Sequence, residues 1–323
     1  DKDELDKILS NLLMSLPKRD HRRIRRLVQP AFLERNLADV SVMVGQVVEE
    51  SLGKLSGEIN LVQVTQHIPL VVMGRLVGIS PDDFPKFKGL SDSIMATYST
   101  SETDPKLALE GIEILKGIIA SRQQNPNGDF ISQLMQKSEE DGDALSLDEV
   151  MAFIGSLLAA GADTTRHFLN ANTLVFLREQ GTLQLLKDQP ELVPDAVSEA
   201  ARVNSFSHSG GVRFATQDTQ IRGQKIKNGE MIKFNVNTAN IDPEAFPEPN
   251  RFDMSRNNLK DVMIFGAGSH FCVGAALAKM IAYQFTAQFA GLFPNARLIS
   301  EPVYEKDFIA RSMFSLPVAL NNT

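Results

Sequence analysis

The sequence predicts a mainly α-helical chain with a small β-rich lobe, organised as one domain over residues 1–323. Apolar residues with helical spacing fill the first two-thirds, and short alternating segments follow residue 210. Of the 323 residues, 43% are hydrophobic and 23% are charged. This length and apolar content suffice for a buried core, and they exclude a disordered or collagen-like chain.

Four ranges carry apolar residues three and four positions apart, the spacing of one helix face. They are residues 37–55, 61–77, 107–119 and 150–177. The sequence Ser146-Leu147-Asp148-Glu149 has the form of a capping box, so a long helix should start near Leu147 and extend beyond Leu169. A last apolar helix is expected over residues 275–292. The acidic residues 139–143 lack the alternating ligands of a calcium loop and are expected to form a solvated loop.

The β-rich lobe is predicted from short alternating segments at residues 212–215, 219–221 and 231–234. Gly223 and the pair Asn228-Gly229 stand between these segments, where tight turns favour glycine. Short antiparallel strands joined by such turns are therefore expected in this part of the chain.

Composition restricts the partners and the cell compartment. The net charge of −7 argues against nucleic acid as a partner. Cys272 is the one cysteine, which excludes an intrachain disulfide and fits a reducing cytoplasm. The longest uncharged helical run, residues 150–162, is shorter than the roughly 20 residues that cross a membrane. The charged start of the chain does not fit a signal peptide, so we expect a cytoplasmic enzyme that binds no membrane.

Cys272 stands on a glycine-rich loop directly before the predicted helix 275–292. Free amide groups and the dipole at a helix amino terminus favour a thiolate over a thiol. Gly266 permits a tight turn, and Gly274 lets a flat partner approach the backbone. A soft sulfur anion beside an open, flat space suits haem iron. Taken alone, however, a single cysteine is more often a small buried hydrophobic side chain.

Residues 265–278 follow the pattern Phe-Gly-x-Gly-x-His-x-Cys-x-Gly-x-x-Leu-Ala. This pattern closely resembles the haem-binding loop of the cytochrome P450 family. The resemblance implies a multihelical P450-like fold, haem b as the cofactor, and Cys272 as the proximal ligand of the iron. It also implies that Phe265 shields the sulfur side of the ring and that His270 bonds a haem propionate.

Within the predicted long helix, residues 159–165 read Ala-Ala-Gly-Ala-Asp-Thr-Thr. Small residues permit close packing, and a threonine hydroxyl can bond a carbonyl one turn back and bend the helix. Ordinary helix packing accounts for this pattern as well. The segment resembles the oxygen-binding groove of the family's distal helix, which implies that Ala160 and Gly161 contact the haem. The resemblance also implies that Asp163 and Thr164 are the catalytic acid–alcohol pair that relays protons during activation of O2.

A basic helix near the start of the chain provides candidates for an anion site. His21 and Arg25 lie four residues apart, so both can reach one anion from the same helix face. Residues 20–26 resemble the family helix whose histidine and arginine hold a propionate, and Arg213 matches a third propionate ligand. The resemblance thus implies these haem-contacting residues: His21, Arg25, Ala160, Gly161, Arg213, Phe265, Gly266, His270, Cys272 and Gly274.

The other arginines of this helix point elsewhere, either as docking points for an acidic electron-transfer protein or as a solvated face. They are Arg22, Arg23 and Arg26. The chain has no flavin or nicotinamide motif and no cysteine cluster for iron–sulfur. Electrons should therefore come from separate partners, a ferredoxin and its reductase.

Further segments resemble structural and substrate-binding parts of the family. Glu199-Ala200-Ala201-Arg202 and residues 246–252 resemble the Glu-x-x-Arg network, which implies a structural role for Glu199, Arg202 and Arg251. His67 is interpreted as a helix residue without function, whereas the roles of His167 and His208 stay open. The resemblance implies these substrate-pocket walls: Phe153, Leu157, Ala160, residues 207–212 and residues 312–314.

Two departures from the family pattern stand out. Lys227 occupies a position where proline is usual. Family members also carry a longer segment before the helix at residues 20–26. The N-terminal part is therefore expected to be short or missing, through a fragment, an incomplete sequence or an unusually short natural member.

The leading hypothesis is a haem-thiolate monooxygenase that inserts one oxygen atom from O2 into a small organic substrate by hydroxylation or epoxidation. One alternative is a haem-binding or ligand-binding protein of the same fold without turnover. Another is a helical scaffold without haem that buries its cysteine.

Overall fold

The structure is a computed structural model, and it describes residues 2–32, 38–96, 105–126, 129–140, 143–207, 211–305 and 310–320. The chain separates into two compact units. The helical unit comprises Asp1–Leu55, Val62–Arg166 and Cys272–Phe289, and the mixed unit comprises Ser56–Leu61, His167–Phe271 and Ala290–Thr323. The organisation of residues 1–323 as one domain stays a prediction.

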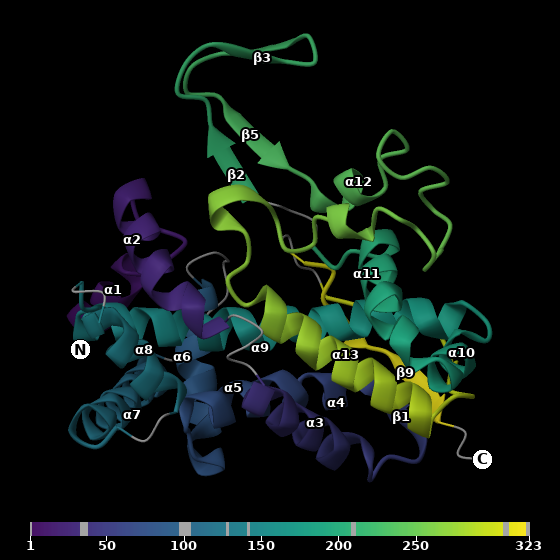
Figure 1. Ribbon diagram of the computed structural model, residues 1–323, viewed down its shortest axis with the longest axis horizontal. Coiled ribbons are helices and arrows are strands. Elements are labelled where there is room, and N and C mark those ends of the chain that lie inside the picture. Colours follow the sequence, from purple (N-terminus) through teal and green to yellow (C-terminus); the bar gives the residue numbers. More distant parts are fainter. Residues whose placement is uncertain are drawn as a thin grey trace. The chain divides into compact units, whose positions relative to one another are not determined.

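The helical unit is built from helices joined by short connections (Figure 1). The predicted helix at residues 61–77 is divided at Gln66 into two helices, and the predicted helices at 107–119, 150–177 and 275–292 are confirmed. The helices are α1 (Lys2–Ser10), α2 (Lys18–Val28), α3 (Ala38–Leu52), α4 (Leu61–Thr65), α5 (His67–Val77), α6 (Phe84–Ala96), α7 (Pro105–Gln124), α8 (Phe130–Glu140), the first part of α9 (Leu147–Arg178) and most of α13 (Ala275–Leu292).

The start of α9 follows from the capping box that the sequence contains. The Ser146 amide donates to Glu149 Oε2 at 2.8 Å, and the Glu149 amide donates to Ser146 Oγ at 3.2 Å. These reciprocal bonds satisfy two amides that lack partners within the first helical turn. The predicted start near Leu147 is therefore confirmed, and α9 continues without interruption to Arg178.

Close packing of α6 against α7 depends on two glycines. A Cβ added at Gly89 of α6 would lie 2.4 Å from Leu107 Cβ, and one added at Gly111 of α7 would lie 2.8 Å from the Lys86 carbonyl oxygen. Both distances are far shorter than a normal contact between these atoms. The two helix backbones can approach this closely because neither glycine carries a side chain.

The mixed unit contains the β-rich lobe. A three-stranded antiparallel sheet has the order β1-β9-β6, and three further pairs are β2 with β5, β3 with β4 and β7 with β8. The strands are β1 (Gly57–Asn60), β2 (Gly211–Phe214), β3 (Thr219–Ile221), β4 (Gln224–Ile226), β5 (Met231–Phe234), β6 (Arg297–Leu298), β7 (Val303–Tyr304), β8 (Met313–Ser315) and β9 (Pro317–Leu320). The helices are the end of α9, α10 (Thr182–Asp188), α11 (Val193–Val203) and α12 (Val236–Asn240).

The three predicted strands between residues 212 and 234 are confirmed to within one residue. In Figure 1 the β3–β4 hairpin extends from the open end of the β2–β5 ladder. Arg222 and Gly223, which join β3 to β4, have φ values of 46° and 84°. Two successive residues with positive φ form the turn that best matches the twist of a hairpin.

Of the helices among the described residues, none combines the length and the apolar character that crossing a membrane requires.

Exchange of Gly89 for alanine tests the close contact between α6 and α7. Gly89→Ala should lower the free energy of unfolding by about 1–3 kcal/mol, because the new methyl group overlaps Leu107. The matched control is Gly117→Ala in α7, where an added Cβ meets no atom within 4 Å. Alanine at that position should stabilise by roughly 0.5–1 kcal/mol through helix propensity. Chemical denaturation of both variants measures the difference, and equal effects would contradict the packing account.

Candidate functional site

Cys272 lies between a short 3₁₀ turn, Gly268–His270, and the start of α13. Gly266 and Gly268 have φ values of 72° and 70°, which side chains other than glycine rarely adopt. The chain can therefore turn sharply before the cysteine, as the sequence predicts. A Cβ added at Gly274 would meet no atom within 4 Å. The backbone after the cysteine is thus open on the side where a side chain would otherwise project.

The Cys272 side chain is exposed, so a ligand can reach the sulfur. Neighbouring protein atoms nevertheless screen the thiol from bulk water, and this burial raises its pKa above the ordinary value. A backbone hydrogen bond from Gly274 and the charge of Arg25 act in the opposite direction but are outweighed. The Gly274 amide thus favours a thiolate, as the position before a helix predicts, but burial outweighs this effect. A coordinated metal cation, in contrast, deprotonates a thiol outright.

The helix α2 supplies a positive charge that acts on Cys272. Arg25 is half-buried and lies close enough to Cys272 for its charge to act on the sulfur. His21, one turn earlier, is buried with 4% exposure. The structure therefore brings one predicted propionate ligand together with the predicted iron ligand.

Residues 160–164 form the middle of α9, and their side chains differ in exposure and in hydrogen bonding. Ala160 and Thr164 are exposed, and the Thr164 hydroxyl donates a hydrogen bond to the Ala160 carbonyl oxygen one turn back. Asp163 Oδ1 accepts a hydrogen bond of 2.7 Å from Arg166 Nε. The back-bonded threonine that the sequence predicts is present. It leaves the Thr164 oxygen with lone pairs that can accept a hydrogen bond.

Gly161 has a packing role within the helical unit. An added Cβ would lie 2.8 Å from the sulfur of Met73, a buried residue of α5. The missing side chain thus lets α5 and α9 approach closely. This contact explains the glycine without a cofactor, and the contact of Gly161 with haem stays a prediction.

In the mixed unit, the residues before Cys272 are held by aromatic contacts. The Phe265 ring packs edge-on against Phe168 at 5.6 Å and lies 6.5 Å from the ring of Phe271, measured between centroids. Phe168 belongs to the last part of α9, so this helix helps to fix the start of the loop. His270 is exposed in the 3₁₀ turn.

Arg213 projects from β2 into solvent. Its guanidinium lies 5.9 Å from the centre of the Phe234 ring on the paired strand β5, and Nη1 donates to the Val212 carbonyl oxygen at 2.8 Å. The cation–π contact steadies the arginine without consuming its remaining donors. These donors are available to an anion.

Another part of the mixed unit involves a histidine whose role the sequence left open. His167 is buried, and its Nε2 lies 3.2 Å from Ser312 Oγ, within hydrogen-bond distance. Its ring also stacks on Phe206 at 6.1 Å between centroids. His167 therefore joins α9 to β8 and its preceding turn, a structural role that no sequence spacing revealed.

The predicted substrate walls differ in their exposure. Ser312 and Met313 are buried with 1% and 2% exposure, whereas Phe314 is 65% exposed. In the helical unit, Phe153 and Leu157 are buried, and the Phe153 ring packs on Phe32. Residues 208–210, which include His208, lie outside the described residues. The role of this set in binding substrate stays a prediction.

The Glu-x-x-Arg pair forms a buried network in the mixed unit. Arg202 donates to both carboxylate oxygens of Glu199, at 2.7 and 2.8 Å, and both side chains are fully buried. The third member is Arg256, whose Nε donates to Glu199 Oε1 at 3.0 Å. Arg251, which the sequence analysis assigned to this place, instead forms an exposed ion pair with Glu248. The prediction that the Arg251 side chain belongs to the Glu199 network is therefore wrong.

The main chain of Arg251, unlike its side chain, contacts the network. The Arg251 carbonyl oxygen accepts hydrogen bonds from both Arg202 and Arg256, so the residue belongs to the network through its main chain. Residues 253–255 then turn the chain, since the Ser255 amide bonds the Asp253 carboxylate at 3.0 Å. This turn brings Arg256 back to Glu199, and no sequence spacing reveals such a reversal.

The comparisons with known proteins decide the family. The family model described as cytochrome P450 matches residues 178–293. Cytochrome P450 CYP107DY1 of Priestia megaterium is 32% identical over 314 residues, which cover 95% of this chain and 76% of the relative. The epothilone C/D epoxidase of Sorangium cellulosum is 30% identical and covers 95% of this chain and 76% of its own. This chain belongs to the cytochrome P450 family.

The solved structures agree with this family. The epothilone B-bound cytochrome P450epoK superposes with a TM-score of 0.89 at 29% identity, over 99% of this chain and 83% of that chain. The multihelical P450-like fold with a small β-rich lobe is therefore confirmed. The protein is a P450 monooxygenase that uses haem b, and the alternatives of a binding protein without turnover and of a scaffold without haem are not favoured.

Several features of this P450 fit haem b. Cys272 offers the one thiol of the chain on an exposed side chain, and thiolate is a haem ligand of P450s. The backbone at Gly274 is open to a flat group. Arg25 places a positive charge near the sulfur, where a propionate can be paired. The donor set therefore matches the cofactor of the family.

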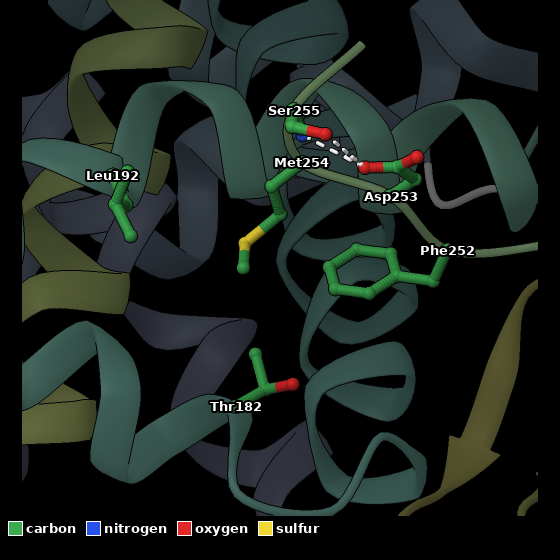
Figure 2. A pocket seen from close by; sticks show the side chains of 6 residues that line it. All are labelled: Thr182, Leu192, Phe252, Asp253, Met254 and Ser255. Atoms are coloured by element: carbon green, nitrogen blue, oxygen red, sulfur yellow. Dashed lines mark hydrogen bonds between the residues drawn. The ribbon is translucent and has the colours of Figure 1, made fainter.

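A cavity of about 340 Å³ lies elsewhere in the mixed unit (Figure 2). Figure 2 shows that the Asp253 carboxylate in its wall is already bonded to the amide and hydroxyl of Ser255. None of the predicted haem or substrate residues lines it. The cavity is therefore separate from the candidate site. It is lined by Thr182, Leu192, Phe252, Asp253, Met254 and Ser255.

Truncation of the two arginines tests the corrected network. Arg256→Ala should lower the free energy of unfolding by about 3 kcal/mol or more, because it removes a partner of the buried Glu199 carboxylate. Arg251→Ala removes an exposed ion pair and should change stability by no more than about 1 kcal/mol. Urea denaturation of the haem-loaded variants measures both values. The assignment of Arg256 is wrong if Arg251→Ala proves to be the more damaging change.

Proposed function

We propose that Cys272 is the proximal ligand of haem iron in this P450. The observation that carries the proposal is an exposed sulfur at the start of α13, with the charge of Arg25 acting on it. Burial disfavours the free anion at this position, and a bound metal cation would stabilise the thiolate. Phe265 and Gly266 shape the loop before the cysteine, and Gly274 leaves room after it.

We also propose that the propionates of the haem are held by His21, Arg25, Arg213 and His270. Two of these side chains are arginines, whose guanidinium forks suit carboxylates. We propose that Ala160 and Gly161 of α9 would also contact the haem. Ala160 is exposed and small, which leaves space for a ligand beside the helix.

When bound, the haem supplies the activation of O2, so that substrate, O2, two electrons and two protons give an oxygenated product and water. We propose that Asp163 and Thr164 deliver the protons. The Thr164 hydroxyl donates a hydrogen bond to the Ala160 carbonyl oxygen and presents its lone pairs, so it can hold a hydrogen-bond donor in place. Asp163 is partly exposed and can exchange protons with solvent.

The substrate proposed for this P450 is a moderately sized organic molecule that undergoes hydroxylation or epoxidation. One of the relatives carries the name of an epothilone C/D epoxidase. Epoxidation of a carbon–carbon double bond is therefore a reaction to test alongside hydroxylation. Phe314, with 65% exposure, is one predicted wall residue whose ring is accessible to such a molecule.

We propose that electrons come from a ferredoxin and its reductase and that the protein works in the cytoplasm. Fewer arginines of α2 are available for docking an electron-transfer protein than the sequence predicts. Arg23 and Arg26 form ion pairs with acidic residues of the same unit. Arg22 is exposed and remains a docking candidate.

The variant Cys272→Ala tests the proximal ligand. The ferrous protein with carbon monoxide should lose the red-shifted Soret band that a thiolate ligand produces. Absorption spectroscopy of both proteins at equal haem content provides the measurement. A variant that kept the red-shifted band would exclude Cys272 as the iron ligand.

The variant Thr164→Ala tests the proton relay. Haem binding should persist, while product formed per reductant consumed should fall by at least about tenfold, since proton delivery is impaired. Thr164→Ser keeps the hydroxyl and should remain close to wild type. Thr173→Ala serves as a second control, because Thr173 also bonds a carbonyl one turn back in α9. Unchanged coupling in Thr164→Ala would remove this residue from the relay.

A further inference from the structure

A half-buried cluster of charges attaches α2 to the start of α9 within the helical unit. Arg23 Nε donates to Asp143 Oδ1 at 2.8 Å, and Nη1 donates to Glu149 Oε1 at 2.6 Å. Nη2 adds contacts of 3.3 Å to Glu149 Oε2 and to the Ala144 carbonyl oxygen. All three nitrogens of this guanidinium are therefore engaged. We call Arg23, Asp143 and Glu149 the α2 clamp.

The carboxylates of the α2 clamp are themselves held in place. Glu149 accepts the Ser146 amide at 2.8 Å as part of the capping box, and Asp143 accepts Arg26 Nη2 at 3.0 Å. Burial works to raise the pKa of Glu149, but the hydrogen bonds from Arg23 and the Ser146 amide outweigh it, and the pKa lies below its ordinary value. The carboxylate is thus charged at neutral pH, and its orientation is set by the start of α9.

The clamp lies opposite Arg25 on α2. At 3.6 residues per turn, Arg23 and Arg25 are about 160° apart around the helix axis. The buried face lies between them and consists of His21, Ile24, Leu27 and Val28. Apolar contacts along such a face are non-directional and allow a helix to roll about its axis. The bidentate bonds of Arg23 on one flank fix this rotation.

The rotation of α2 decides where Arg25 points. Arg25 is half-buried on the flank of α2 away from the clamp, so a roll of the helix would move its guanidinium. We propose that Arg23 is a positioning residue: through the α2 clamp it fixes the roll of α2 and so holds Arg25 beside Cys272 and the haem propionate. This inference rests on the proposed function, in which Arg25 binds that propionate.

The test measures how fast haem leaves the holoenzyme. Haem transfer to an excess of a haem-free scavenger protein gives the dissociation rate. Arg23→Gln should accelerate this rate about tenfold or more, as is typical when the partner that orients a ligand is lost. The matched control is Arg22→Gln, which removes the same charge from the exposed neighbour and should leave the rate close to wild type. Arg23→Lys, which keeps the charge but loses the fork, should fall between them.

A double-mutant cycle separates positioning from general stability. If Arg23 acts through Arg25, the variant Arg23→Gln/Arg25→Gln should lose haem no faster than Arg25→Gln alone. If the double variant instead loses haem at a rate accelerated by the product of the two single effects, the two residues act independently. That result would overturn the positioning role. Fast haem dissociation from Arg25→Gln, together with a wild-type rate in Arg23→Gln, would reject the inference. The proposal that Arg25 binds a propionate would then still stand. A normal rate in Arg25→Gln would reject both.

The position of the propionate bending bands in the resonance Raman spectrum provides a second readout. These bands report hydrogen bonding of the propionates and do not follow overall stability. The frequencies of these bands should shift in the same direction in Arg23→Gln and Arg25→Gln, and they should stay unchanged in Arg22→Gln. An unchanged band in Arg23→Gln, beside a shifted one in Arg25→Gln, would contradict the inference even if Arg23→Gln unfolds more easily.

Discussion

The proposed bond between the Cys272 sulfur and haem iron is the interaction on which the account depends. Protein atoms around the thiol raise its pKa, while the Gly274 amide and the Arg25 charge compensate only in part. The loop therefore holds a sulfur that is accessible to a ligand but whose free thiol has a raised pKa. A metal cation bound to this sulfur would hold it as a thiolate, and a thiolate bound to iron would donate the electron density that favours O–O cleavage.

The long helix α9 serves different purposes along its length. Its start is fixed by the capping box and by the α2 clamp. Its middle carries Asp163 and Thr164, where one side chain is paired with Arg166 and the other is bonded to a carbonyl one turn back. In the mixed unit, Phe168 near its end packs against Phe265. One continuous helix thus carries the proposed relay residues and also packs against the loop that is proposed to bind the cofactor.

The sequence predicts most of the fold because its signals are local. Helical periodicity, the capping box at Ser146 and the glycines at tight turns depend on neighbours in the chain, and each is confirmed. The family pattern around Cys272 then supplies the cofactor, which composition alone could not.

The remaining features depend on partners far apart in the chain. Arg256 replaces Arg251 in the Glu199 network because a turn at residues 253–255 reverses the backbone. Arg23 pairs with residues more than one hundred positions away, so its role could not be distinguished from that of a solvated arginine. The pKa of Cys272 likewise depends on how much protein surrounds it, which the sequence does not reveal.

X-ray absorption at the iron edge tests the central claim most directly. The ferric holoenzyme should show a sulfur atom in the first coordination shell of the iron, at a distance typical of a thiolate. A first shell made only of nitrogen and oxygen atoms would contradict the account.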